Sequence, residues 1–403
     1  MNCNKPLQLK SRTNKYTVIY NCAIISLFGY VFLSDFVNAV LHVGAFKPAT
    51  ALLTVLFSGL YIGLDWKNLV YKKVLIVSFS LTLLYILILK NEQSNYLYTP
   101  LFGFLLVQKP AVSLKAIDKI FIIQFVALFY EFVTRHHLYD KVTVGLFILK
   151  ELDFDYESIM VETGFKCKGL FIGVLVATCF VINYSLINRN NIKKSFWAMV
   201  MSILINGRLA MIICGLVFLY NYYLKTNGYK TKFNYSYIIG IGIAIVLGGF
   251  VVATTSDSLA VQNLFRVFDT SEASNAGRIA RYGLALNALS NYGFVDYLFG
   301  SKYELLDQWN RVVPPESDVL GMLLDIGIVG FGVVLVGLFF GWKSGKQPLF
   351  LPNMISYKFA LLMSVISIIQ YRHLSGNLRG LMFWFLLMLI LYENNYKTNS
   401  VRR

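Results

Sequence analysis

The sequence predicts an all-α polytopic membrane protein with about 12 transmembrane helices. Hydrophobic residues make up 57% of the 403 residues, charged residues only 14%, and the mean hydropathy is +0.59. A soluble domain would carry roughly 25% charged residues. The apolar residues form runs of about 18 or more, long enough to cross a bilayer as helices. They do not alternate with polar residues, as the strands of a membrane barrel would.

Twelve apolar runs define the predicted helices. The first follows the polar segment MNCNKPLQLKSRTNKY and shows no small-residue cleavage site, so we expect a retained helix. The region 195–224 is interrupted at Asn206-Gly207-Arg208, which predicts two short helices that meet at one membrane face. The predicted helices span residues 16–33, 47–64, 73–89, 95–108, 117–134, 169–187, 195–206, 208–224, 235–254, 318–341, 355–371 and 378–392.

The charges of the loops predict the orientation. An even number of helices puts both termini on one side. Each of the loops WKNLVYKK, QKPAVSLKAIDK, NRNNIKK, KTNGYKTKFN and WKSGKQPLFLPN carries at least two Lys or Arg. The positive-inside rule therefore places these loops and both termini in the cytoplasm. KNEQSN and two long segments, 135–168 and 255–317, lie on the outer side and carry most of the acidic residues.

The whole chain, 1–403, is expected to form a single integral membrane domain with two large outer loops, 135–168 and 255–317. Both loops contain aromatic and apolar residues, so we expect them to be ordered, with parts lying on the membrane surface as short helices. The net charge of +16 comes from lysines clustered between apolar runs. That pattern is typical of loops that flank membrane spans and argues against a nucleic-acid partner.

Cysteines and histidines predict neither a disulfide framework nor a metal site. The five cysteines include no C-x-x-C pair and lie mostly in apolar runs or at the N-terminus, as buried small apolar residues do. His136 and His137 follow the fifth helix with no carboxylate or cysteine at ligand spacing, which favours surface or interfacial histidines. We expect no metal and no cofactor.

Arg208 lies between two apolar runs, MVMSILING and LAMIICGLVFL. An arginine at a helix end can extend its head group to the membrane surface. An arginine at a membrane edge is also a candidate functional group. The predicted topology places Arg208 outward, where the positive-inside rule gives no reason for it, and this favours a functional role.

Arg278 and Arg281 lie three residues apart in SEASNAGRIARYG, with Arg266 twelve residues upstream. They could lie on a solvated loop face. The lead-in also suits a helix start with Ser274 or Asn275 as N-cap, followed by the helix RIARYGLALNAL. Two guanidinium groups in the first turns of a helix form an anion site, especially for phosphate.

Acidic residues follow the second large loop. Glu316 and Asp318 lie where VVPPESDVLGMLLDIGIVGFG enters the membrane from outside. Either could cap the helix, or could accept a proton from a substrate hydroxyl, because a carboxylate at a dry boundary has a raised pKa. Asp325 lies about two turns deeper and is expected to face the protein interior.

The last outer loop, YRHLSGNLRG, adds candidate substrate-binding residues. It places three cationic or titratable side chains on the outer side, where they could join the same positively charged mouth. They are Arg372, His373 and Arg379.

Three of these segments, in this order, resemble the O-antigen polymerase (Wzy-type) and O-antigen ligase superfamily. They are NGRLAMIICGL after a short outward-going helix, NAGRIARYGLAL in the large outer loop, and ESDVLGMLLDIGIVGFGVVL at the following helix. Together they span about residues 195–341. Ligases of the superfamily typically carry a histidine at the position that Glu316 occupies here, so the resemblance favours a polymerase.

The resemblance implies a metal-independent, GT-C-like glycosyltransferase of the bacterial inner membrane that joins repeat units linked to undecaprenyl diphosphate on the periplasmic face. A sugar hydroxyl of one unit would attack the anomeric carbon of the growing chain, and undecaprenyl diphosphate would leave. Arg208, Arg278 and Arg281 would stabilise the leaving diphosphate. Glu316 or Asp318 would act as the base, and Arg266, Arg372, His373 and Arg379 would bind substrate.

Other functions remain open at this stage. An O-antigen ligase shares the fold, and a flippase for lipid-linked oligosaccharides also has about twelve helices. A flippase usually shows two similar halves, and no such duplication is evident here. A scaffold that regulates chain length would not need outer arginines on several segments; such a regulator could instead be a protein partner, beside the lipid-linked oligosaccharide donor and acceptor and the bilayer.

Overall fold

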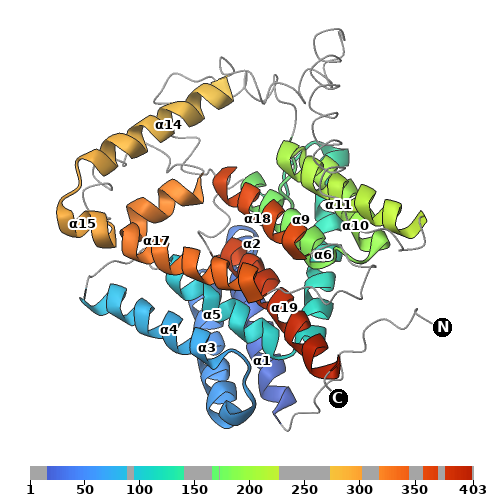
Figure 1. Cartoon of the computed structure of the whole chain (residues 1–403). Helices are drawn as coiled ribbons and strands as arrows, with labels where there is room; N and C mark the ends of the chain where they lie inside the picture. The colour runs from blue at the N-terminus through green and yellow to red at the C-terminus, as the bar shows by residue number, and fades with distance from the viewer. Residues whose placement is uncertain are drawn as a thin grey trace.

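The chain folds as an assembly of helices in the computed structural model (Figure 1). The structure describes residues 16–88, 95–139, 166–171, 173–226, 273–301, 317–344, 357–370 and 377–401, and within these ranges there is no β-strand. The all-helical prediction is therefore confirmed for the part of the chain that is described.

The N-terminal half begins with a helical hairpin. A continuous helical stretch of 25 residues, Thr17–Leu41, runs antiparallel to α3 (Phe46–Leu64). The first stretch comprises α1 (Thr17–Phe28), the π-helical turn η1 (Gly29–Leu33) and α2 (Ser34–Leu41). After the short η2 (Trp66–Asn68), α4 (Lys72–Leu83) continues into a second π-helical turn, η3 (Leu84–Ile88), and α5 (Asn95–Gln108) follows.

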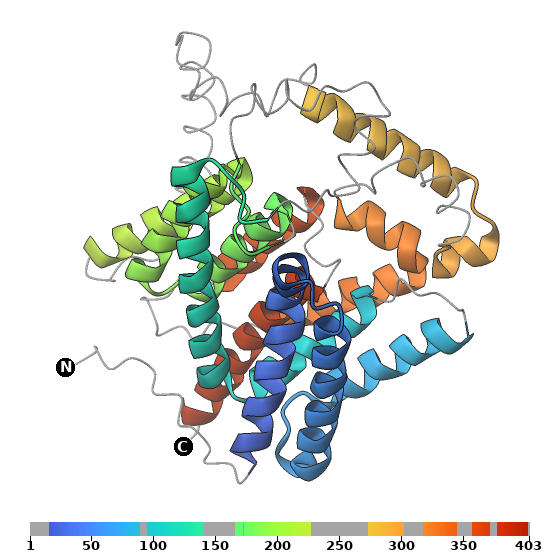
Figure 2. The same cartoon turned by 180° about the vertical axis from the view of Figure 1, so that it is seen from behind.

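The remaining helices complete the assembly (Figure 2). They are α6 (Pro110–Thr134), α9 (Val174–Ile187), α10 (Ile192–Ile205), α11 (Arg208–Thr226), α14 (Ala273–Ser290), α15 (Phe294–Phe299), α17 (Asp318–Ser344), α18 (Tyr357–Gln370) and α19 (Asn377–Val401). In both views α1 begins and α19 ends at the same end of the assembly.

Eleven of the 12 predicted helices coincide with helices of the structure, and the predicted helix 235–254 lies outside the described residues. Their extents differ. The first continues to Leu41, and α6 begins at Pro110, inside the segment predicted as a loop. The predicted start of the helix 169–187 is wrong, because α9 begins at Val174 and residues 169–171 are not helical. Three helices are long and apolar enough to cross a membrane: Thr17–Leu41, Phe46–Leu64 and Asp318–Val336. Four shorter apolar helices accompany them: Tyr96–Gln108, Val174–Ile187, Arg208–Tyr223 and Leu378–Tyr392.

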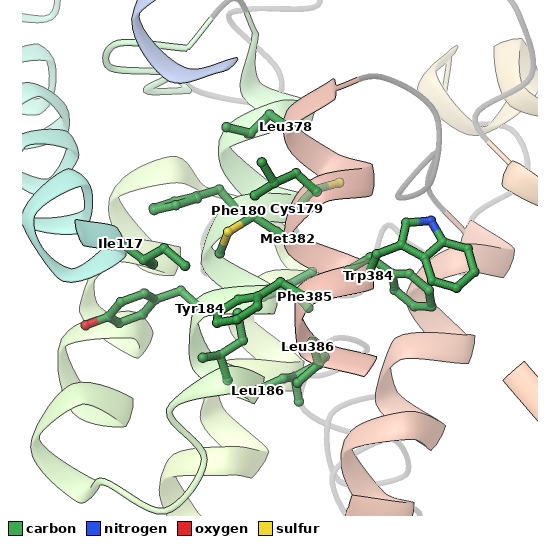
Figure 3. Close-up of a cluster of buried hydrophobic side chains, with 14 of the residues drawn as sticks. Ile117, Cys179, Phe180, Tyr184, Leu186, Leu378, Met382, Trp384, Phe385 and Leu386 are labelled. Carbon is green, nitrogen blue, oxygen red and sulfur yellow. The ribbon is translucent and has the colours of Figure 1, made fainter. Parts of the chain in front are cut away.

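Two helices form the centre of the structure. Every residue of α9 from Ala177 to Ile187, and every residue of α19 from Leu381 to Ile390, is buried. A helix that is apolar and buried on all sides lies in the core, surrounded by other helices. Figure 3 shows Phe180 and Tyr184 of α9 beside Met382 and Phe385 of α19. By contrast, α3 exposes a row of leucine and valine side chains, as a peripheral helix in lipid would.

A glycine allows α5 to pack directly against the central helix. A Cβ atom at Gly103 would lie 2.7 Å from both the carbonyl carbon and the Cβ atom of Trp384. Only hydrogen fits there. Small residues at helix contacts are typical of membrane proteins, because they let two backbones approach closely.

The predicted interruption at residues 206–208 is confirmed. α10 ends at Ile205, Asn206 adopts a left-handed conformation with φ 56°, and α11 begins at Arg208. Asparagine tolerates this conformation better than most residues. The turn folds α11 back against α10 and α9 (Figure 2).

The prediction of one uninterrupted helix over 318–341 is wrong. α17 is broken at Gly327, where φ is 63° and ψ is −172°. That backbone conformation is essentially restricted to glycine. In Figure 1 the two halves of α17 run in different directions from this point. Asp325, expected to face the interior, is only half-buried beside the break.

The helix predicted around Arg278 and Arg281 is present as α14, but its predicted start is wrong. α14 begins at Ala273, so Ser274 and Asn275 lie within its first turn and not at the N-cap. Arg278 and Arg281 consequently lie in the second and third turns. The described part of the segment 255–317, residues 273–301 and 317, thus contains the helices α14 and α15.

Candidate functional site

A cavity with a volume of about 230 Å³ opens among segments that are far apart in the sequence. Its wall is formed by η1 and α2, the first turn of α3, the residues just before α9 with the first turn of α9, and the first turn of α19. The lining residues are Tyr30, Val31, Phe32, Ser34, Asp35, Lys47, Leu170, Phe171, Val176, Leu378 and Arg379. Leu378 also belongs to the buried core between α9 and α19 (Figure 3), so the cavity adjoins that core.

The π-helical turn η1 forms one wall. Gly29 is the first residue of η1, and a Cβ atom there would lie 3.2 Å from the Thr50 side chain of α3. The wider turn places Tyr30, Val31 and Phe32 on the cavity. The Ser34 hydroxyl donates to the Tyr30 carbonyl at 2.6 Å. π-helical turns occur frequently at functional sites, because they rotate side chains out of the regular helical register.

The segment opposite η1 is held by buried side chains of α6. Glu131 is fully buried, and its carboxylate accepts hydrogen bonds from the backbone N–H groups of Lys168 (2.7 Å), Gly169 (2.9 Å) and Leu138 (3.0 Å). Gln124 accepts from the Leu170 N–H and donates to the Lys168 carbonyl, both at 2.8 Å. Four of these bonds hold the backbone that carries Leu170 and Phe171 to the cavity, and the fifth, from Leu138, holds the chain just after α6.

Gly169 is required in this segment. Its φ is 59°, and a Cβ atom there would lie 2.7 Å from the Gln124 amide. Burial raises the pKa of the neighbouring Cys167 thiol to about 12. The thiol is therefore protonated at neutral pH and is not a nucleophile. His137 lies 3.4 Å from Glu131, and the described residues contain no group of three or more metal-ligating side chains.

Three charged side chains line the cavity. Lys47 Nζ lies 3.3 Å from Asp35 Oδ1, and the two side chains are 48% and 28% exposed. The third is Arg379, which is half-buried at the start of α19. Two cations and one carboxylate give a formal charge of +1. In the predicted topology, all three residues lie at the outward ends of their helices.

The sequence had singled out Arg379 but missed Lys47 and Asp35. Lys47 stands in AFKPAT as the first residue of the second predicted helix, 47–64, a position that the predicted topology places on the outer side. The argument that singled out Arg208, a cation where the positive-inside rule asks for none, applies equally to Lys47. Sequence alone gives no signal for Asp35, whose relevance follows from its contact with Lys47.

The structure places two other predicted residues away from the cavity. Arg208 is half-buried at the first position of α11. Asp318 is fully buried at the first position of α17. Neither lines the cavity. Glu316, Arg266, Arg372 and His373 lie outside the described residues.

Arg278 and Arg281 belong to a helix that packs on the first half of α17. Ala285 and Ala288 of α14 bury a small apolar cluster with Leu324 of α17. This contact joins the helix that carries both arginines to the helix that begins with Asp318. α11 packs instead on α9 and α10. The convergence of Arg208 with the two α14 arginines stays a prediction.

No family model matches this chain, and no curated protein matches it.

Proposed function

We propose that this chain is a polysaccharide polymerase of the inner membrane, a glycosyltransferase that joins repeat units linked to undecaprenyl diphosphate. The observation that carries the proposal is the cavity, where Lys47 and Arg379 lie beside Asp35. Arginine and lysine bind phosphate and polyhydroxyl groups through charge-assisted hydrogen bonds. The resemblance of residues 195–341 to O-antigen polymerases supplies the reaction, and the predicted topology supplies the periplasmic side.

The size of the cavity suits one end of such a substrate. Its volume of about 230 Å³ is below the roughly 300–1,000 Å³ of sites that enclose a drug-sized ligand. A single sugar ring would occupy it, and the lipid tail would lie along the exposed apolar faces of the surrounding helices. Asp35, held by Lys47, would accept hydrogen bonds from sugar hydroxyls.

The chemistry needs a base and a stabilised leaving group. An acceptor hydroxyl attacks the anomeric carbon of the growing chain, the bond from that carbon to the diphosphate oxygen breaks, and the hydroxyl proton passes to a carboxylate. Asp318 or Glu316 would take that proton. Arg208, Arg278 and Arg281 would stabilise the negative charge on the departing diphosphate, because fixed charges in a water-poor site need no reorganisation.

The test is complementation of a strain that lacks the gene, with the surface polysaccharide separated on a gel. Wild type should restore a ladder of chain lengths. Arg379→Ala should leave mostly single repeat units on the lipid core, and Arg379→Lys should restore part of the ladder. Arg135→Ala is the matched control, because this exposed arginine does not line the cavity.

The alternatives give different gels. A strain without a ligase attaches no units and accumulates lipid-linked polymer, and a strain without a flippase shows neither product. A deletion strain with either of these patterns would contradict the proposal of a polymerase. A normal ladder from Arg379→Ala would contradict the proposed site while leaving the proposed activity in place.

A further inference from the structure

The short helix α15 exposes three apolar side chains in succession around one polar residue. Phe294 is 79% exposed, Val295 is 61% exposed and Tyr297 is 47% exposed. Large apolar side chains gathered on one surface mark a contact with lipid or with another molecule. α15 lies outside every predicted span, so a position within a transmembrane helix does not account for the exposure of these side chains.

α15 packs against the break in the most apolar candidate span. Asp318–Val336 has a mean hydropathy of 2.5, against 1.8 and 1.4 for the other two candidate spans. A Cβ atom at Gly300 would lie 2.5 Å from the Asp325 carbonyl carbon, and one at Gly327 would lie 2.4 Å from that of Leu298. The backbone after α15 is therefore in direct contact with the break, as both views show (Figures 1 and 2).

The segments next to α15 also expose apolar side chains. Ile328 and Val329, 41% and 37% exposed, directly follow the break. Ile86 and Leu87, 44% and 68% exposed, follow Tyr85 of η3, whose ring lies 6.3 Å from that of Phe299. These four side chains belong to helices predicted to cross the membrane, where such exposure means contact with acyl chains. α15 packs directly against α17, and its Phe299 ring lies beside that of Tyr85 in η3, so it adjoins both of these helices.

The carbonyl groups of Leu324 and Ile326, next to the break, accept hydrogen bonds from residues outside α17. The Leu324 carbonyl accepts from the Ser301 N–H at 3.1 Å, and the Ile326 carbonyl accepts from the Tyr85 hydroxyl at 2.8 Å. The Tyr292 hydroxyl lies 2.9 Å from the Ser301 carbonyl and 3.1 Å from that of Leu324. Non-helical backbone is tolerated at membrane depth only when protein groups satisfy it in this way.

We propose that α15 is seated in the bilayer, at the boundary between head groups and acyl chains, with Phe294, Val295 and Tyr297 among the lipids. Apolar faces of interfacial helices bury about 5–10 Å into this boundary. The single carboxylate, Asp296, sets a shallow depth, because a charged group would be costly deeper in the bilayer. Tyrosine is enriched at the same level. The inference does not depend on the proposed enzyme activity.

Spin-label accessibility tests the proposal. Single cysteines at positions 294 and 295 are introduced into a cysteine-free version of the full chain, labelled, and reconstituted in phosphatidylcholine–phosphatidylglycerol vesicles. Collision rates with oxygen, which concentrates in lipid, and with a water-soluble nickel chelate are then measured. Ile123→Cys, on the exposed face of α6, gives the lipid reference, and Asn190→Cys, in the exposed turn before α10, gives the water reference.

At both positions we expect the ratio of oxygen to nickel collision rates to be closer to that of the lipid reference, Ile123→Cys, than to that of the water reference, Asn190→Cys. A ratio close to that of Asn190→Cys would overturn the proposal, because α15 would then face water. Protection from both reagents would also overturn it, since protein would cover the surface. Dipolar broadening that disappears on dilution with unlabelled protein would assign the surface to a second copy instead. A label at position 297 checks the result if either first variant misfolds.

Discussion

At the scale of single residues, the lysine and arginine side chains on the predicted outer side identify the candidate site. Lysine and arginine on the cytoplasmic side are explained by the positive-inside rule, whereas those on the outer side need another reason. Arg379 and Lys47, which the predicted topology places on the outer side, have such a reason, because both line one cavity. The sequence predicted Arg379 through its loop, but the 3.3 Å contact of Lys47 with Asp35 depends on tertiary structure.

Glu131 is the residue whose loss should most disturb this site without touching substrate. Glu131→Ala leaves three backbone N–H groups without their acceptor, and each unsatisfied buried group costs about 1–3 kcal/mol. We expect the free energy of unfolding, measured by SDS titration in mixed micelles, to fall by about 3 kcal/mol or more. Glu131→Gln keeps one carbonyl oxygen and should lose less.

Arg135→Ala is the control for this measurement, because its exposed side chain lies one turn beyond Glu131. A loss for Glu131→Ala no larger than that of the control would show that segment 168–171 is held by other contacts. Activity should fall with stability in Glu131→Ala, because the same segment carries Leu170 and Phe171 to the cavity.

At the scale of elements, apolar runs predict where the helices lie, but they do not predict every break within a helix. Each of the 11 predicted helices within the described residues overlaps a helix of the structure, and three of the described helices are long and apolar enough to cross a membrane. The break at Asn206-Gly207 was predictable, since polar and flexible residues interrupt the run there. The break at Gly327 was not, because LLDIGIVGFG offers three glycines in an apolar run and packing against α15 selects one.

Gly327→Ala tests the break directly. The substitution forces a Cβ atom into a conformation nearly restricted to glycine and to within 2.4 Å of the Leu298 backbone. We expect the free energy of unfolding to fall by about 2–4 kcal/mol. Gly332→Ala is the matched control on the same helix, because nothing lies within 4 Å of its added Cβ. Equal stability of the two variants would mean that α17 can straighten without cost.

At the scale of the whole molecule, composition predicted an all-helical membrane protein, and loop charge predicted a sidedness that gathers the cavity residues on the outer face. Three described helices are long and apolar enough to cross a membrane. What sequence could not supply is the contact between η1, α3 and α19, because their order along the chain does not predict which helices become neighbours. Likewise, the sequences of α9 and α19 resemble those of the other predicted spans, although both helices are buried on all sides in the structure.

The most direct test of the account is polymerisation by the purified chain in vesicles. The substrate is the single repeat unit on undecaprenyl diphosphate, extracted from cells that lack the gene, and the product length is read on a gel. Wild type should form chains of many units. Arg379→Ala should be at least about tenfold slower, the cost of one charge-assisted hydrogen bond, and Arg135→Ala should be unchanged. Unchanged single units after incubation with folded wild-type protein would contradict the account.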